Sequence, residues 1–206
     1  MEMFGIFTND TSSVLSQGVN SACDGEYSHC ALAFVTEEAP TDMVFFECTW
    51  AIGNSKPGGG LRGPIHFSHL QAWKSERPDT RTLHAERVNL SDADAKAAYA
   101  WSLRMVGKVE YAYLQLPLAL LALRGGIAIS ARKQKDLKWT CSEYVARAMP
   151  PKFQVHALGI GNTTYDFIVP DSSSFPSMLD GIRRWNDQHV YPLHREDIPR
   201  WTCLEE

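Results

Sequence analysis

Cys141 lies where a short polar stretch changes to helical spacing, in the segment "WTCSEYVARAM". A thiol is a strong nucleophile only as the thiolate, and the positive end of a helix favours the thiolate. Thr140 is a typical N-cap residue, so we expect Cys141 in the first helical turn, where free N–H groups could stabilise an oxyanion. Considered alone, Cys141 also fits a small buried apolar side chain.

A strand carries the candidate base. The segment "YSHCALAFV" (27–35) alternates, with His29, Ala31, Ala33 and Val35 on one face and Cys30, Leu32 and Phe34 on the other. The small alanines leave room for another element to pack closely on the face of His29. The structural alternative is a hydrogen-bonded histidine in the core.

The next strand carries a candidate partner for this histidine. "MVFFECT" (43–49) is predicted to be a strand, joined to the first by the turn-rich residues 36–42. A symmetric hairpin pairs His29 with Thr49 and puts Glu47 diagonally across, on the same face as His29. A carboxylate there would orient the imidazole and stabilise its charged form. A slip of one residue would turn Glu47 to the opposite face, and a solvated glutamate is the structural alternative.

Cys141, His29 and Glu47 together have the nucleophile, base and orienting group of a thiol hydrolase. Their order along the chain does not matter, because such triads are defined by geometry. The backbone N–H of Cys141 is one expected oxyanion donor, with Tyr27 as a candidate second donor and Ser142 as a further oxyanion or substrate contact. This chemistry needs no metal, nucleotide or other cofactor.

Four segments carry a family resemblance: "YSHCALAF", "FFECT", "WTCSEYVARAM" and "IVPDSSSFPSM". They resemble, in this order, segments of the circularly permuted papain-like hydrolases related to NlpC-type cell-wall peptidases, with the bacterial YiiX-like proteins nearest. The resemblance implies an α+β permuted papain-like fold, in which an antiparallel sheet packs against the nucleophile-bearing helix. It also implies a cysteine amidase or peptidase acting on peptidoglycan-type or other small peptides. Cys30 departs from the family, where an aliphatic residue is more usual, and we expect it to face away from His29.

Two other functions remain open. Relatives of lecithin:retinol acyltransferase use the same permuted framework for acyl transfer, so the chain could be a lipid acyltransferase or thioesterase. The leucine-rich residues 114–123 would then line an acyl channel. A non-catalytic binding module of the same fold is the third possibility.

Composition limits the class of protein. The 206 residues, 44% hydrophobic and 21% charged, predict one globular domain over 1–206. The net charge of −4 and the lack of a basic run argue against nucleic acid as a partner. Five cysteines without a CxxC motif fit a reducing compartment. With no signal peptide and no transmembrane segment recognised, we expect synthesis as a cytoplasmic protein, with later release left open. The oligomeric state is unknown.

Other segments complete the expected α+β order of strands, helices and a final strand. A helix is expected from Ser91, with Ala93, Ala97, Trp101 and Met105 on one stripe. Further helices are expected from Pro117 to Gly125, and from Cys141 to the proline pair at Pro150. Residues 165–181 suggest a strand followed by a proline-punctuated tail.

Two remaining features have weaker functional readings. His66 and His69 form an HxxH pattern with no third ligand, so a zinc site is not expected. Glu143 lies two residues past Cys141 and is expected to be a surface acid.

Overall fold

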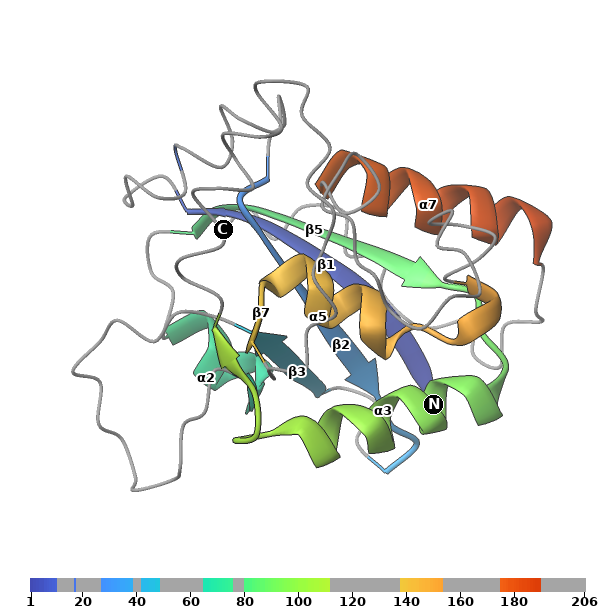
Figure 1. Cartoon of the computed structure of the whole chain (residues 1–206), viewed down its shortest axis with the longest axis horizontal. Helices are drawn as coiled ribbons and strands as arrows, with labels where there is room; N and C mark the ends of the chain where they lie inside the picture. The colour runs from blue at the N-terminus through green and yellow to red at the C-terminus, as the bar shows by residue number, and fades with distance from the viewer. Residues whose placement is uncertain are drawn as a thin grey trace.

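The protein is a mixed α+β structure built on a five-stranded antiparallel sheet with the order β4-β3-β2-β1-β5 (Figure 1). The computed structural model describes residues 1–10, 17, 27–38, 42–48, 65–75, 80–111, 138–153 and 175–189. The strands of the sheet are β1 (Glu2–Asp10), β2 (His29–Val35), β3 (Met43–Cys48), β4 (Ile65–His69) and β5 (Thr80–Val88).

The helices are α2 (Leu70–Ser75), α3 (Asp92–Met105), α5 (Cys141–Ala148) and α7 (Phe175–Gln188). A short parallel pair joins β6 (Glu110–Tyr111) to β7 (Lys138–Trp139), and β7 leads directly into α5. The chain therefore enters α5 from an anchored strand, which fixes the start of that helix.

Different elements cover the two faces of the sheet. The helices α3, α5 and α7 cover one face, with α5 in the middle and in contact with both neighbours (Figure 1). The strand residues that share a buried cluster with α5 include Cys30, Leu32 and Phe34. On the opposite face, Trp73 of α2 stacks on Phe45 with ring centroids 4.7 Å apart. The strands β2 and β3 direct apolar side chains to both faces of the sheet, which fits strands that are covered on both sides.

A glycine allows α7 to approach the sheet. A Cβ atom added at Gly5 of β1 would lie 2.7 Å from Cδ1 of Ile182. Ile182 is fully buried, so the missing side chain in β1 provides the space that the isoleucine fills. The close contact holds α7 over β1 and the edge strand β5.

The predicted hairpin is confirmed, including its register. β2 and β3 pair antiparallel with Leu32 opposite Phe46 and Val35 opposite Met43, which is the register of the predicted symmetric hairpin. The helix α3 begins after Ser91, whose side chain accepts a hydrogen bond from the Asp94 N–H, as the sequence predicted.

The predicted stripe of α3 is buried only in part, because Trp101 and Met105 pack against the core and the two alanines do not. The buried residues are Ala95, Ala98 and Ser102, whereas Ala93 and Ala97 are exposed. Alanine and serine carry so weak a hydrophobic signal that the periodicity could not distinguish the two faces.

The predicted tail after residue 174 was also wrong, because Phe175–Gln188 form α7. Its buried residues Met178, Leu179, Ile182 and Trp185 recur at helical spacing. Pro176 does not prevent the helix, because proline is tolerated in a first turn, where the N–H has no intrahelical acceptor.

The predicted helix from Pro117 to Gly125 and the predicted strand at the start of residues 165–181 lie outside the described residues. In the described ranges, no helix is both long and apolar enough to cross a membrane. The single domain over 1–206 stays a prediction.

Candidate active site

The start of α5 is fixed by a capping box. The side chain of Thr140 accepts a hydrogen bond from the Glu143 N–H, and a Glu143 carboxylate oxygen accepts one from the Thr140 N–H at 2.8 Å. Cys141 is therefore the first residue of α5, as predicted. The N–H groups of Cys141 and Ser142 have no intrahelical acceptor, and they stand at the positive end of the helix dipole.

Trp139 of β7, two residues before Cys141, packs against an aromatic ring and a guanidinium group. The indole of Trp139 stacks on Trp101 of α3, with centroids 5.7 Å apart. The guanidinium of Arg147, two turns along α5, lies 4.9 Å from the Trp139 ring centroid. These contacts join β7, α3 and α5 around the residue that comes just before the cap, so the helix start has little freedom to shift.

His29 and Glu47 form the predicted pair. Nε2 of His29 lies 2.9 Å from Oε2 of Glu47, on the diagonal of the β2–β3 ladder. The Glu47 side chain is 2% exposed and that of His29 is 12% exposed, so the pair is largely shielded from water. An ion pair with so little solvent around it interacts more strongly than one on the surface.

The sulfur of Cys141 also interacts with His29, through a side-chain hydrogen bond and through charge. A hydrogen bond from Cys30 and the nearby imidazolium of His29 hold the pKa of Cys141 well below its usual value, although burial opposes this. The structure thus brings together the three residues that the sequence suggested, from α5, β2 and β3.

Another element packs closely on the face of Ala31 and Ala33, as predicted, because Trp73 of α2 lies in the same buried cluster. The helix α5 instead packs against the face of Cys30, Leu32 and Phe34. His29 reaches Cys141 because it is the first residue of β2, at the strand end where α5 begins.

Two further thiols surround Cys141, and the sequence did not indicate them as site residues. Cys30 was expected to be core facing away from His29; it is buried, yet its thiol hydrogen bonds to Cys141. Burial, with the neighbouring Cys141 charge, raises the pKa of Cys30 well above its usual value. The Cys48 thiol donates to the carbonyl oxygen of Trp139 at 3.4 Å.

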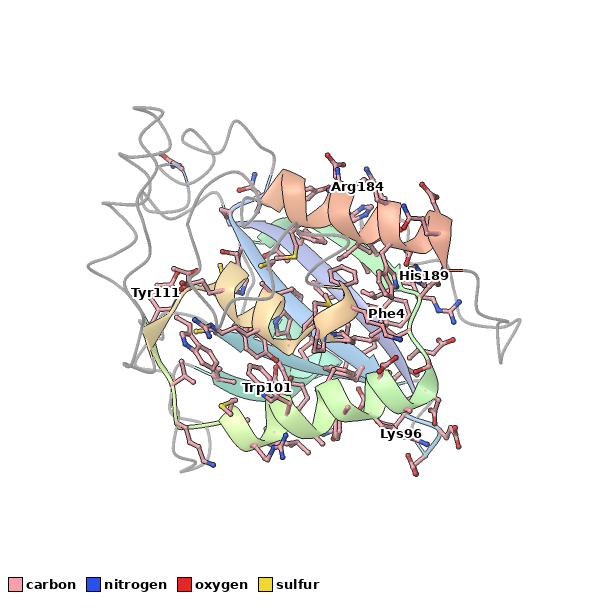
Figure 2. All side chains as sticks on the ribbon, turned by 45° about the vertical axis from the view of Figure 1, so that its right-hand side comes forward. Phe4, Lys96, Trp101, Tyr111, Arg184 and His189 are labelled. Atoms are coloured by element: carbon pink, nitrogen blue, oxygen red, sulfur yellow. The ribbon has the colours of Figure 1, made fainter. Side chains whose placement is uncertain are left out.

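Tyr111 is another residue that sequence reasoning missed. It pairs with Trp139 in the β6–β7 ladder, and Figure 2 shows it near the N-terminal end of α5. Burial raises the pKa of the Tyr111 phenol, and the Cys141 charge contributes to the same shift. The phenol therefore stays protonated near Cys141. The only sequence signal was its position just before the leucine-rich stretch, which points to no particular chemistry.

The two predicted oxyanion contacts have other partners. The ring of Tyr27 packs against Phe7 and His84, with centroid distances of 5.8 and 6.1 Å. The hydroxyl of Ser142 lies 3.2 Å from that of Thr140 and is half-buried. Their roles as oxyanion or substrate contacts stay predictions.

The surface acid predicted at Glu143 was wrong. The residue is 3% exposed, because it is the third residue of the helix and turns back to the Thr140 N–H. A Thr-x-x-Glu pattern at 140–143 is the sequence signature of this arrangement. Burial raises the pKa of the Glu143 carboxyl, against the opposing hydrogen bond from Thr140.

Comparisons with known proteins give no family for the chain: no protein-family model, curated protein or solved structure matches it. Across the ranges that the structure describes, no three His, Cys, Asp or Glu side chains are grouped to hold a metal ion. The leucine-rich residues 114–123 lie outside those ranges.

Proposed function

We propose that the protein is a cysteine hydrolase that cleaves amide or peptide bonds through a thioester on Cys141. The observation that supports this most directly is the chain of contacts from Glu47 to His29 to Cys141, supplied by three different elements. A helix start, an imidazole and a buried carboxylate around one sulfur are the parts that thiol catalysis needs. A permuted papain-like fold, suggested by the sequence resemblance, is part of the same proposal.

In this mechanism His29 carries the proton. Nε2 of His29 bonds Glu47, and in the proposed mechanism Nδ1 exchanges the proton with the sulfur. The Cys141 thiolate attacks the carbonyl carbon, and the oxyanion forms near the N–H groups at the start of α5. The imidazolium of His29 then protonates the leaving amine, the C–N bond breaks, and a thioester remains.

Water completes the cycle. Neutral His29 takes a proton from water, the hydroxide adds to the thioester carbonyl, and the C–S bond breaks to release a carboxylic acid and the thiolate. Glu47 keeps the imidazole oriented through both steps and stabilises its charged form. The phenol of Tyr111 and the side chains of Tyr27 and Ser142 are the candidate additional oxyanion or substrate contacts.

The substrate class rests on the resemblance of the four sequence segments. It points to small peptides, with peptidoglycan stem peptides as the first to test. A panel of stem peptides, simple peptide amides and fatty-acyl esters compares these substrates directly. Faster turnover of the acyl esters would favour the acyltransferase or thioesterase alternative.

The test uses mass spectrometry of the full-length protein and of the products. We expect wild-type protein to cleave a member of the peptide panel and to carry a trapped acyl group on Cys141. Cys141→Ala should abolish both, and His29→Ala should slow turnover by about 10²–10⁴-fold, the usual contribution of a general acid–base group.

Cys48→Ala is the matched control, because it removes a neighbouring buried thiol that the mechanism does not use. Its turnover should stay within a few-fold of wild type. Cleavage that survives in Cys141→Ala, or acyl labelling undiminished in His29→Ala, would exclude the proposed pair. Absence of cleavage and of any acyl adduct across the panel would favour a binding module.

A further inference from the structure

Cys30 and Cys141 form a pair of thiols in direct contact. They come from different elements, since Cys30 is the second residue of β2 and Cys141 the first of α5. Both are buried, at 1% and 5% exposed, and their side chains hydrogen bond to each other. The Cys30 backbone N–H also hydrogen bonds to the Cys141 sulfur. The Cys30 thiol and the Cys30 backbone N–H therefore both keep the Cys141 sulfur next to Cys30.

The surroundings make the two sulfurs chemically different. Cys141 stands at the positive end of α5 beside His29, whereas Cys30 lies within a strand among apolar neighbours. Because His29 and the start of α5 favour the charged form of Cys141, we infer that Cys30 is the donor in the hydrogen bond between the two sulfurs. A thiolate with a protonated thiol as its neighbour is the arrangement found where an oxidised cysteine is captured by a resolving cysteine.

We propose that hydrogen peroxide converts Cys30 and Cys141 into an intramolecular disulfide, which makes the pair a reversible oxidation site. The Cys141 thiolate attacks one peroxide oxygen, the O–O bond breaks, and a sulfenic acid and hydroxide form. The Cys30 sulfur then attacks the Cys141 sulfur, the S–S bond forms, and the S–O bond breaks. The Cys30 proton and the released hydroxyl leave as water, so peroxide is reduced as the two sulfurs are oxidised.

This site has a consequence for the proposed hydrolase. The disulfide would remove the nucleophile and would also keep Cys141 from oxidation to sulfinic acid, which ordinary thiols do not reverse. A dithiol reductant should restore both free thiols. The oxidation itself does not depend on hydrolysis, so the two proposals can fail separately.

Cys48 provides a matched control within the same cluster. It is buried near Cys141, but its thiol donates to the Trp139 carbonyl oxygen. Its replacement removes a neighbouring thiol while it leaves the Cys30–Cys141 contact in place. Cys23 and Cys203 lie outside the described residues, and peptide mapping separates them from this cluster.

The experiment treats full-length protein with hydrogen peroxide, blocks remaining thiols, and maps disulfides and acids by peptide mass spectrometry. In wild type and Cys48→Ala we expect a Cys30–Cys141 cross-linked peptide that disappears on addition of dithiothreitol. In Cys30→Ala we expect no such peptide, with sulfenic acid on Cys141 that dimedone traps and more sulfinic acid at long exposure. Cys30→Ser serves the same purpose with a side chain closer in size.

Three outcomes would overturn the inference. The first is sulfinic acid on Cys141 in wild type while Cys30 stays reduced. The second is a disulfide that joins Cys141 to Cys48 or to another cysteine in place of Cys30. The third is resistance of Cys141 to peroxide at concentrations that oxidise free cysteine. The mapping is read without any substrate, so a protein that forms the disulfide but cleaves no peptide would keep this inference and lose the hydrolase.

Discussion

The buried carboxyl group of Glu143 lies close enough to Cys141 for their charges to interact. Its pKa is raised above the ordinary value of 4.5, chiefly by burial, so the folded protein binds this proton more tightly than the unfolded chain. The stabilising contribution of this group is therefore complete below about pH 4.5 and is lost as the pH rises through the folded-state pKa.

Glu143→Gln tests this linkage. Glutamine can accept the Thr140 hydrogen bond but cannot ionise, so we expect the variant to gain stability relative to wild type as the pH rises from about 4 to about 7. Urea unfolding at both pH values measures the difference. Glu38→Gln, which changes an exposed glutamate, is the control. An effect of Glu143→Gln that is equal at both pH values would contradict the pKa direction.

Residue types and strand alternation were enough to predict part of the site. The sequence identified His29, Glu47 and Cys141, because a hairpin register and a helix start can both be read locally. It missed the contact between Cys30 and Cys141, since a thiol inside an apolar strand looks like ordinary core. It also misassigned Glu143, whose pattern with Thr140 indicates a capping box as readily as a surface acid.

Among the elements, the short helix α5 depends most on its N-terminal cap. With only eight residues, it gains little from intrinsic helix propensity and relies on its packing and its ends. The Thr140 hydroxyl accepts a hydrogen bond from the Glu143 N–H, and the Glu143 carboxylate accepts one from the Thr140 N–H. This pair of bonds fixes where the helix begins.

Thr140→Ala should therefore lower the free energy of unfolding by about 1 kcal/mol, the usual effect of losing an N-cap side chain. Thr140→Ser keeps the hydroxyl and should retain most of that stability. Urea unfolding of both variants provides the comparison. Equal losses for alanine and serine would mean that the methyl group of Thr140, rather than its hydroxyl, matters.

Element types were predicted best where a local signal was strong. The strands β2 and β3 and the start of α3 followed the alternation and the capping residues. The helix α7 was missed because the serines before it and Pro176 are typical of an irregular segment. The buried residues of α7 nevertheless have helical spacing. Only tertiary packing against β1 and β5 decides between these two readings.

Among the described elements, α3, α5 and α7 share one face of the sheet, and contacts between these helices hold α5 in position. The phenol of Tyr144 in α5 donates to the hydroxyl of Ser102 in α3 at 2.8 Å, and both residues are fully buried. Because no water reaches this bond, either group left alone would be unsatisfied.

Tyr144→Phe should lower the free energy of unfolding by about 1–3 kcal/mol, since it leaves the Ser102 hydroxyl buried without its donor. Adding Ser102→Ala to that variant should recover part of the loss, because it removes the unsatisfied group. A double-mutant cycle by urea unfolding measures the coupling. Strictly additive effects of the two changes would contradict a direct bond between these side chains.

The arrangement of the whole sheet was the least predictable feature. The neighbours of β1 are β2 and β5, and nothing local in the sequence specifies a pairing between β1 and a strand some eighty residues away. The sequence predicted the α+β class but neither this strand order nor the face that α5 covers. Such pairings depend on which apolar faces fit together in the folded protein. The same holds for α5, which packs on the face of the sheet that carries Cys30.

The proposed hydrolysis depends on activation of Cys141 by His29, and the pH dependence of Cys141 alkylation tests this most directly. Iodoacetamide labelling of Cys141, followed by peptide mass in wild type, His29→Ala and Cys48→Ala, gives the three profiles. We expect the wild-type and Cys48→Ala rates to reach half their plateau well below the free-thiol value of about pH 8.5, and that of His29→Ala to shift upward towards it. Superimposable wild-type and His29→Ala profiles, or a wild-type midpoint at the free-thiol value, would contradict activation of Cys141 by His29.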